Sequence, residues 1–409
     1  MAPSTLVSRR SFMRFAGTAA AAVPLLSEAP RLLAADSAQH DPYMGRFKMP
    51  DANAVIISSN ENPLGPSAGA LAAMSQAMRQ GGRYHSETKN QVVEAFSRSF
   101  DLQPGYVSIW AGSTPALDMA LRWNIGPGKA LVVGNPSYEQ GPRAAQSMKA
   151  PLFSVPLTAT GAHDVRAMVA ATPNAGAYYI VNPNNPTGTM TPREDILWLL
   201  ANKPAGSIVI VDEAYHHFSK DEPVIDQVAA DKDIIVTRTF SKIYGMAGLR
   251  AGLYIARPDL QAPSISRLGP AATLDGAGEV SMATAHACTV SVTDRTLVPA
   301  RRKINADIRE ATLEWMDRRG YKVYAGSQAN FFMVDVKRPG RDFAALMQRQ
   351  DVYIGRTWPA MPTYVRITVG TAEEMRKFRA AFVKAYDTEP AVAHASLPYS
   401  APSELQFLA

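Results

Sequence analysis

Past residue 100 the chain contains seven short apolar segments that predict β-strands. Most of them carry Val, Ile, Leu, Ala and Tyr in continuous runs rather than at alternate positions, as strands do when both faces of their sheet are covered. The segments are "VSIWAG", "ALVVGN", "LFSVP", "AYYIVN", "SIVIVD", "IIVTRT" and "AGLYIA". This part of the chain is therefore expected to form a buried sheet.

Amphipathic helical patterns separate several of these segments. Apolar residues recur at helical spacing in "PALDMALRW" from residue 115, in "REDILWLLA" from 193 and in "EPVIDQVAAD" from 222. Strands that alternate with helices build a mostly parallel sheet with helices on both faces. The order of elements predicts an α/β fold for the larger part of the chain.

A second pattern begins after residue 300. "RRKINADIREATLEWMDRRG" (301–320) predicts a long amphipathic helix, and "FFMVDV", "VYIGRT" and "YVRITVG" predict strands before a last helix, "AEEMRKFRAAFVKAY". This order predicts a smaller α+β domain, which residues before 85 complete. The expected organisation is a signal segment (1–35), an arm with part of the small domain (36–85), a large domain (86–300), the rest of the small domain (301–388) and a loose tail rich in Pro, Ala and Ser (389–409).

The composition narrows the class of protein. Of 409 residues, 46% are hydrophobic, which is enough to bury a large core. The single cysteine, Cys288, excludes an internal disulfide and a cluster of thiolate metal ligands. The net charge of +6 comes without a run of Lys or Arg, so it does not indicate nucleic-acid binding. No apolar run reaches the roughly 20 residues that a membrane-spanning helix needs.

The first residues resemble an export signal. "SRRSFMRF" (Ser8 to Phe15) places two arginines before the modestly apolar "FAGTAAAAVPLL", which is the order of a signal peptide. The pattern resembles a twin-arginine signal, which is recognised by a receptor, with cleavage near Ala35. A periplasmic or extracellular protein is expected if the signal works, and a cytoplasmic protein if it does not. The alternative is a disordered basic N-terminus with no role in export.

Polar residues follow most of the predicted strands of the large domain. In open α/β sheets, ligands bind beyond the carboxyl ends of the strands, so these residues form a candidate site. They are Ser113, Thr114, Tyr138, Asn185, Asp212, Tyr215, Thr239, Ser241 and Lys242, with Arg250 eight residues further on. One ligand would use all of them, namely a phosphorylated, planar, cationic heterocycle that can trap an amine.

Several residue types fit the ring of such a ligand. Lys242 supplies the amine for a Schiff base, and the carboxylate of Asp212 keeps a ring nitrogen protonated. Tyr138 stacks on the ring, while Asn185 and Tyr215 hydrogen-bond a ring oxygen.

The phosphate has its own set of residues. Backbone N–H groups at a helix start near Ser113 and Thr114 form an anion cradle. Thr239, Ser241 and Arg250 join it, and arginine suits phosphate because its planar fork binds two oxygens at once. Lys242 and Arg250 are thus expected on the same loop because the ring and the phosphate that they bind belong to one ligand.

Eight stretches in sequence order resemble one family. They are "NENPLG" (60–65), "RYH" (83–85), "AGST" (111–114), "NPNNPTG" (182–188), "VDEAY" (211–215), "TFSKIYGMAGLR" (239–250), "ANF" (329–331) and "YVRITVGT" (364–371). On these stretches the chain resembles the class I/II aminotransferases of pyridoxal phosphate fold type I, and within them the histidinol-phosphate aminotransferase branch. The resemblance implies a large domain with a seven-stranded, mostly parallel sheet, a smaller α+β domain and pyridoxal 5′-phosphate as the cofactor.

The resemblance also implies roles for single residues. Lys242 is expected to carry the Schiff base and to act as the catalytic acid–base group. Arg366 is expected to bind the α-carboxylate of the substrate, aided by Asn185 and Asn62. Tyr84 is expected to reach the cofactor phosphate of a neighbouring subunit, which implies a homodimer with shared active sites.

Arg356, in "YIGRTW", has two interpretations. It occupies the place where relatives have an arginine that can bind a distal group of the substrate, and the alternative is a purely structural charge. No metal site is expected, because His216 and His217 are adjacent and do not face the same way.

The resemblance predicts transfer of an amino group between an amino acid and a 2-oxo acid (EC 2.6.1.-), with ping-pong kinetics. The same cofactor residues also occur in decarboxylases, lyases and oxygen-using oxidases, and a binding module without activity is a third alternative. The chain departs from the branch at Thr114 and Pro115 after the glycine turn, and at His85 after Tyr84. These departures and the expected export favour a substrate other than histidinol phosphate.

Overall fold

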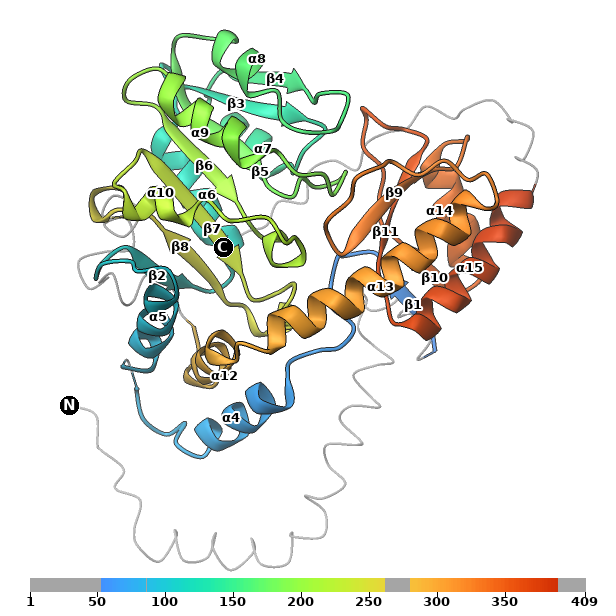
Figure 1. The fold of residues 1–409 in the computed structure, drawn as a ribbon, viewed down its shortest axis with the longest axis horizontal. Coiled ribbons are helices and arrows are strands. Elements are labelled where there is room, and N and C mark those ends of the chain that lie inside the picture. The colour runs from blue at the N-terminus through green and yellow to red at the C-terminus, as the bar shows by residue number, and fades with distance from the viewer. Residues whose placement is uncertain (1–52, 86, 262–279, 389–409) are drawn as a thin grey trace, which may run out of the picture. The chain divides into compact units, whose positions relative to one another are not determined.

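The computed structural model describes residues 53–85, 87–261 and 280–388 (Figure 1). The predicted signal (1–35) and tail (389–409) lie outside the described residues and stay predictions. Among the described helices, none combines the length and the hydropathy that crossing a bilayer takes.

Seven strands form the central sheet, in the spatial order β2-β8-β7-β6-β5-β3-β4 (Figure 1). Neighbouring strands are parallel except at β8, which runs antiparallel to both β2 and β7. The strands are β2 (Val107–Trp110), β3 (Ala130–Asn135), β4 (Leu152–Pro156), β5 (Ala175–Val181), β6 (Ile208–Asp212), β7 (Ile234–Thr239) and β8 (Gly252–Ile255). All seven predicted strands are present, and the sheet confirms the predicted fold class.

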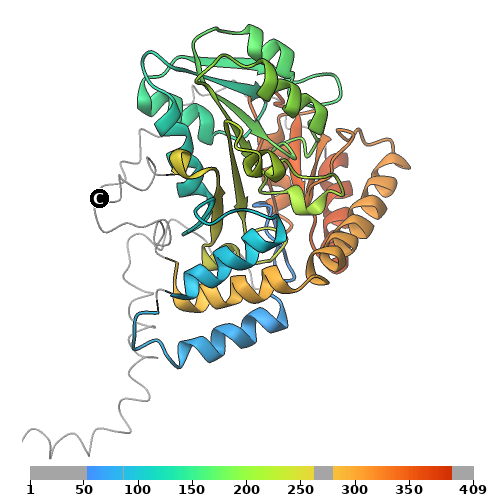
Figure 2. The same cartoon turned by 60° about the vertical axis from the view of Figure 1, so that its left-hand side comes forward.

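Helices cover both faces of this sheet (Figure 2). One face packs against α4 (Ala68–Met78), α5 (Glu87–Ser99), α8 (Val165–Ala170), α9 (Arg193–Asn202), α10 (Ile225–Ala229) and α12 (Met282–Thr293). The other face packs against α6 (Ser113–Asn124) and α7 (Gln140–Met148). Successive strand residues alternate between the two cores, so that Ile180 belongs to the first and Tyr179 to the second. The strands are apolar at consecutive positions because both faces are buried.

Two short sheets and three helices form a second region with its own core. β9 (Phe331–Asp335) pairs antiparallel with β11 (Tyr364–Thr368), and β1 (Val55–Ile57) pairs in parallel with β10 (Val352–Ile354). The helices are α13 (Leu297–Asp317), α14 (Gly340–Gln348) and α15 (Ala372–Asp387). The pairing of β1 with β10 joins residues before 85 to the C-terminal part of the chain.

Side-chain caps mark where several helices begin. The side chains of Ser67, Asp164, Ser281 and Thr371 accept hydrogen bonds from the first turns of α4, α8, α12 and α15. Helix α6, by contrast, begins at Gly112 without a side-chain cap. The first N–H groups of α6 therefore remain available for another partner.

Helix α13 contacts both regions of the fold. Near its start, Arg301 donates a 3.0 Å hydrogen bond to the carbonyl of Ile243, and Arg302 donates a 2.8 Å hydrogen bond to the carbonyl of His217. Near its end, Met316 packs in the core of the second region. The helix thus connects loops of the central sheet to the smaller core.

A buried ion pair joins the ends of β6 and β7. Glu213 directly follows β6, and the guanidinium of Arg238 in β7 lies 2.7 Å from its carboxylate. The two side chains are only 1% and 5% exposed. Burial alone would raise the pKa of Glu213, but the charge of Arg238, together with His216 and the hydrogen bonds from Val224 and Arg238, leaves that pKa lowered. The pair fixes the backbone on either side of the strand ends where the candidate site lies.

Replacing Glu213 by Gln is expected to lower the free energy of unfolding by about 3–5 kcal/mol, because it leaves the charge of Arg238 buried without its partner. Urea unfolding followed by circular dichroism measures the change. Glu373→Gln is the control, since it breaks an exposed pair with Lys377 and should cost less than about 1 kcal/mol. Equal, small losses in both variants would show that the buried pair does not support the sheet.

Candidate active site

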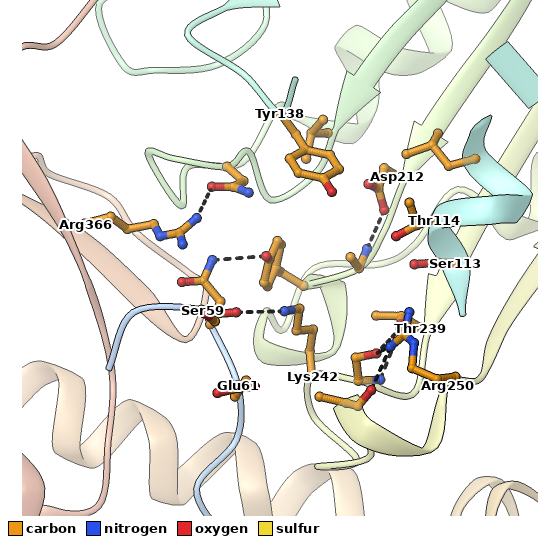
Figure 3. Close-up of a pocket in the computed structure, with 18 of the residues that line it drawn as sticks. Ser59, Glu61, Ser113, Thr114, Tyr138, Asp212, Thr239, Lys242, Arg250 and Arg366 are labelled. Carbon is orange, nitrogen blue, oxygen red and sulfur yellow. Dashed lines mark hydrogen bonds between the residues drawn. The ribbon is translucent and has the colours of Figure 1, made fainter. Parts of the chain in front are cut away.

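One cavity lies where β5, β6 and β7 end (Figure 3). Its volume of about 480 Å³ falls within the range of roughly 300–1,000 Å³ that is common for small-molecule sites. The predicted residues that line it are Ser113, Thr114, Tyr138, Asn185, Asp212, Tyr215, Thr239, Ser241, Lys242, Arg250, Arg356 and Arg366. Residues far apart in the sequence thus meet at the carboxyl edge of the sheet, as the strand order predicts.

One side of the cavity is suited to an anion. Ser113 and Thr114 stand at the uncapped first turn of α6 and face the cavity (Figure 3). Gly112 precedes them with φ 98°, and a Cβ there would lie 2.3 Å from the guanidinium of Arg250. Glycine is required at this position because it tolerates the positive φ and leaves room for the arginine. A positive charge and N–H groups that no described side chain caps therefore converge at one point.

Arg250 is held in place by its own loop. Its backbone is left-handed, with φ 52°, and its guanidinium donates a 2.7 Å hydrogen bond to the carbonyl of Ala247. The hydroxyl of Ser241 lies 3.4 Å from the same guanidinium and accepts a 3.0 Å hydrogen bond from Thr239. A guanidinium and two hydroxyl groups next to a helix start suit a phosphate group.

Asp212 is a buried carboxylate at the end of β6. It is 5% exposed and accepts hydrogen bonds from the N–H of Ala214 at 3.1 Å and from the hydroxyls of Tyr179 at 3.3 Å and Thr237 at 3.4 Å. Burial raises the pKa of Asp212 to about 6, although these hydrogen bonds and the charge of Lys242 oppose the rise. The ionised form of such a carboxylate is stabilised by a cation placed in the cavity.

Lys242 follows β7 and extends into the same cavity (Figure 3). Its ammonium group donates a 3.2 Å hydrogen bond to the carbonyl of Ser59 and lies 5.5 Å from the centre of the Tyr215 ring. Loss of hydration on burial lowers the pKa of Lys242 to about 8, and the charge of Arg366 acts in the same direction. A larger share of this lysine is therefore the neutral amine, the form that attacks a carbonyl group.

Two tyrosines line the middle of the cavity. Tyr138 is partly buried, and its ring lies beside Asp212 in Figure 3. Burial and, to a lesser extent, the negative charge of Asp212 raise the pKa of Tyr138. The hydroxyl of Tyr215 accepts a 3.0 Å hydrogen bond from the amide of Asn60. Both tyrosines therefore stay neutral near physiological pH.

Arg366 lies on the side of the cavity opposite Arg250 (Figure 3). Its guanidinium donates hydrogen bonds of 2.8 Å to the side-chain oxygen of Asn185 and to the carbonyl of Ser58. The side chain is buried, and its Nε has no hydrogen-bond partner within the described part of the chain. A buried guanidinium bound only to neutral acceptors suits a carboxylate ligand.

Arg356 lines the cavity together with Arg366, but its side chain is 47% exposed. It forms an ion pair with the carboxylate of Glu139. Its guanidinium lies 4.8 Å from the centre of the Trp358 ring, and that of Arg366 lies 5.3 Å from the same ring. The sequence predicts Arg356 at the site, but it does not indicate the partners Glu139 and Trp358.

Two predicted site residues lie elsewhere. The amide of Asn62 donates a 3.0 Å hydrogen bond to the carbonyl of Ile243, and its oxygen accepts one of 3.1 Å from the N–H of Leu64. These bonds hold the Asn62 side chain outside the cavity. Tyr84 is fully exposed and is also not among the lining residues. Within one chain, neither side chain takes part in the site.

Asn60 is a site residue that sequence reasoning missed. It is buried, lines the cavity and donates to Tyr215, while its oxygen accepts a 3.1 Å hydrogen bond from the hydroxyl of Thr368. Its backbone is left-handed, with φ 55°, a conformation that asparagine adopts more readily than most residues. The stretch "NENPLG" contains Asn60 and Asn62, and only the fold shows which of the two faces the cavity.

The lining residues fit pyridoxal 5′-phosphate. The cradle between α6 and Arg250 suits its phosphate, Asp212 suits a protonated ring nitrogen, and Lys242 is an amine able to react with its aldehyde. The uncapped start of α6 and the raised pKa of Asp212 are the two features that such a ligand would satisfy.

Comparison with known proteins agrees with this geometry. Residues 52–382 match the family Aminotransferase class I and II. The histidinol-phosphate aminotransferase of Symbiobacterium thermophilum is 33% identical over 329 residues, which cover 79% of this chain and 88% of that protein. An aromatic amino acid aminotransferase of Streptomyces avermitilis is 31% identical over 323 residues, covering 78% and 86%.

A solved structure shows the same fold. The structure of histidinol-phosphate aminotransferase from Sinorhizobium meliloti in complex with pyridoxal-5′-phosphate has a TM-score of 0.74 at 23% identity, and covers 85% of this chain and 96% of that one. The family match includes both the central sheet and most of the second region. The chain therefore belongs to the class I and II aminotransferases, and it is a pyridoxal-phosphate-dependent enzyme that moves an amino group between an amino acid and a 2-oxo acid.

Proposed function

We propose that Lys242 binds the cofactor aldehyde and moves the protons of amino-group transfer. One observation carries this proposal. Lys242, with a pKa of about 8, and the buried carboxylate of Asp212, with a pKa of about 6, line the same cavity. The anion cradle formed by the start of α6 and Arg250 lines that cavity as well. Perturbed pairs of this kind concentrate at catalytic sites.

The other lining residues are proposed to hold the cofactor. Asp212 would hold a proton on the ring nitrogen, Tyr138 would stack on the ring, and Asn185 and Tyr215 would hydrogen-bond the ring oxygen. The phosphate would be bound by Ser113, Thr114, Thr239, Ser241 and Arg250. The convergence of the helix start, the hydroxyls and the guanidinium supports this assignment.

When bound, pyridoxal phosphate supplies an aldehyde for the substrate amine and a ring that accepts negative charge from the α carbon. As a neutral amine, Lys242 would take a proton from the α carbon of the substrate and, once protonated, would act as the general acid. Asp212 would hold a proton on the ring nitrogen of the cofactor. Arg366 would bind the α-carboxylate of the substrate and thereby orient the substrate.

The substrate is proposed to be an amino acid that carries an α-carboxylate, rather than histidinol phosphate, which has none. Arg366 is buried and bound only to neutral acceptors, whereas Arg356 is already paired with Glu139. The relatives named above differ in substrate, so the family match alone does not decide this point.

We also propose a homodimer in which Tyr84 reaches the cofactor phosphate of the partner subunit. A fully exposed tyrosine supports this proposal, as do the exposed apolar side chains of Leu71 and Met78 on α4. Export by the twin-arginine-type segment "SRRSFMRF" is a separate proposal that rests on the sequence alone.

Lys242→Ala is expected to remove covalent attachment of the cofactor and to lower turnover by at least about 10²–10⁴-fold, since general acid–base catalysis contributes this much. Borohydride reduction followed by peptide mapping measures the attachment. Lys220→Ala, at an exposed position, is the control and should keep both properties. A label at another lysine of the wild-type protein would contradict the assignment.

Asp212→Asn is expected to weaken cofactor binding and yet to stabilise the cofactor-free protein at neutral pH. The folded-state pKa of about 6 lies above the ordinary 3.8, so wild-type stability falls as pH rises from about 4 to 6. The uncharged variant escapes this loss, which amounts to about 3 kcal/mol from the shift in pKa. Urea unfolding at pH 4.5 and 7.5 tests the prediction, and a variant that is less stable at both values would count against it.

Arg366→Ala is expected to raise KM for amino-acid substrates by about 10–100-fold, because it removes charged hydrogen bonds to the α-carboxylate. Steady-state kinetics measure the change, with the exposed Arg166→Ala variant as the control. An unchanged KM would remove Arg366 from the substrate site.

A further inference from the structure

Glu139 is a carboxylate beside the candidate site that has no part in the chemistry above. It follows Tyr138 and pairs with Arg356, one of the two arginines beside Trp358. Building on the proposed function, we propose that Glu139 is a specificity-determining residue. By neutralising Arg356 it disfavours substrates whose side chain is negatively charged and favours amino acids with an uncharged side chain.

Within the described residues, the side chain of Glu139 has no hydrogen-bond partner other than Arg356. It stands at the N-cap of α7, where Ser, Thr, Asp and Asn are the residues that normally cap. Its side chain makes no capping hydrogen bond, although a negative charge is favourable at a helix start. The carboxylate turns instead to Arg356, which lies more than two hundred positions further along the chain.

The ion pair joins two parts of the fold at the side of the cavity where Arg356 and Arg366 lie, which we call the substrate end. Glu139 belongs to the segment after β3, and Arg356 belongs to the segment between β10 and β11. Arg356 lines the cavity, whereas Glu139 is not among the lining residues. Glu139 therefore acts on a substrate through Arg356, as a positioning residue, rather than by direct contact.

Arg366 and Arg356, the two arginines of the substrate end, differ in whether a negatively charged group is already bound to them. Arg366 is buried and donates only to neutral oxygens, so its charge is free to meet an α-carboxylate. The charge of Arg356 is already met by Glu139. A substrate with a second carboxylate would have to displace Glu139 from Arg356 or lie close to Glu139. In either case the two negative charges, that of the substrate and that of Glu139, repel each other.

The field of Glu139 extends beyond its partner. Its negative charge opposes the lowering of the Arg366 pKa and contributes to the raised pKa of Tyr138. The ring of Tyr138 lines the cavity, and the buried ring of Trp358 lies beside the guanidinium groups of Arg356 and Arg366. Because Glu139 neutralises Arg356, the substrate end offers the positive charge of Arg366 and the aromatic ring of Tyr138. This combination suits an amino acid with an apolar or neutral polar side chain.

The solvent exposure of Glu139 and Arg356 sets how strongly their ion pair can affect substrate discrimination. The side chains of Glu139 and Arg356 are 28% and 47% exposed, so water screens the pair and its influence is moderate. We expect a change of about two- to fivefold in discrimination, seen in KM more than in kcat.

The test compares substrates of nearly equal size that differ in charge: glutamate with glutamine, and aspartate with asparagine. The half-reaction of each amino acid with the cofactor-loaded protein is followed by cofactor absorbance, so that no oxo acid is needed. Glu139→Gln is expected to raise the ratio of kcat/KM for the acidic over the neutral partner about two- to fivefold. The double variant Glu139→Gln with Arg356→Gln should lose this gain.

A second readout does not depend on turnover. Calorimetry measures the Kd of succinate, which has two carboxylates, and of butyrate, which has one. In Glu139→Gln the affinity for succinate should rise while that for butyrate stays unchanged. Glu373→Gln, which removes one negative charge from an exposed residue that does not line the cavity, is the control and should change neither affinity.

Unchanged ratios in Glu139→Gln would overturn the inference, as would equal gains in Glu373→Gln. A selective loss of lysine or ornithine turnover would also overturn it, because Glu139 would then bind a cationic side chain. Failure of the proposed function is distinct: the wild-type protein would convert no amino acid, whereas the succinate and butyrate affinities would still test Glu139.

Discussion

A carboxylate buried at the end of the central strand is the constraint on which the site depends. β6 is the fourth of seven strands, and Asp212 lies in register with Val181 of β5 and Thr237 of β7. Neighbouring strands and the helices on both faces exclude water, so the ionised carboxylate is costly until a cation meets it. On the proposed role of Asp212, the fold keeps a group that would weaken the cofactor-free protein and would stabilise the cofactor-loaded one, as functional sites commonly do.

The remaining charges of the cavity are arranged around that carboxylate. Arg250 and Arg366 lie on opposite sides of the cavity that Asp212 lines, and Lys242 reaches the same space from the end of β7 (Figure 3). Two separated positive groups suit the two anionic ends of a complex between a phosphorylated cofactor and an amino acid. Lys242 has a lowered pKa because it is buried near Arg366. The same field that attracts the ligands thus also prepares the reactive amine.

The parts of the fold that sequence reasoning could predict are those set by local pattern. Continuous apolar runs gave the seven strands, because both faces of the sheet are buried, and the rule that ligands bind at carboxyl strand ends gave Asp212 and Lys242. Helix α10 is shorter than its pattern from residue 222 predicts, since Asp231 takes a left-handed conformation with φ 57° just beyond its end. Periodicity does not reveal such a stop.

Contacts between distant segments could not be predicted in this way. The choice between Asn60 and Asn62 depends on which side chain Tyr215 and Ile243 engage, and those partners lie more than 150 positions away. The pairing of Glu139 with Arg356 depends likewise on how the second region meets the central sheet. Sequence patterns report local burial, whereas these partners are set by tertiary packing.

Helix α13 has a mechanical consequence. Its start holds the carbonyl of Ile243, the residue after Lys242, and its end is embedded in the core that carries Arg366. Because a hydrogen-bonded α-helix resists bending, a rotation of that core would also move the loop that follows Lys242. A change in the position of Arg366 would then be accompanied by a change in the position of the Lys242 amine.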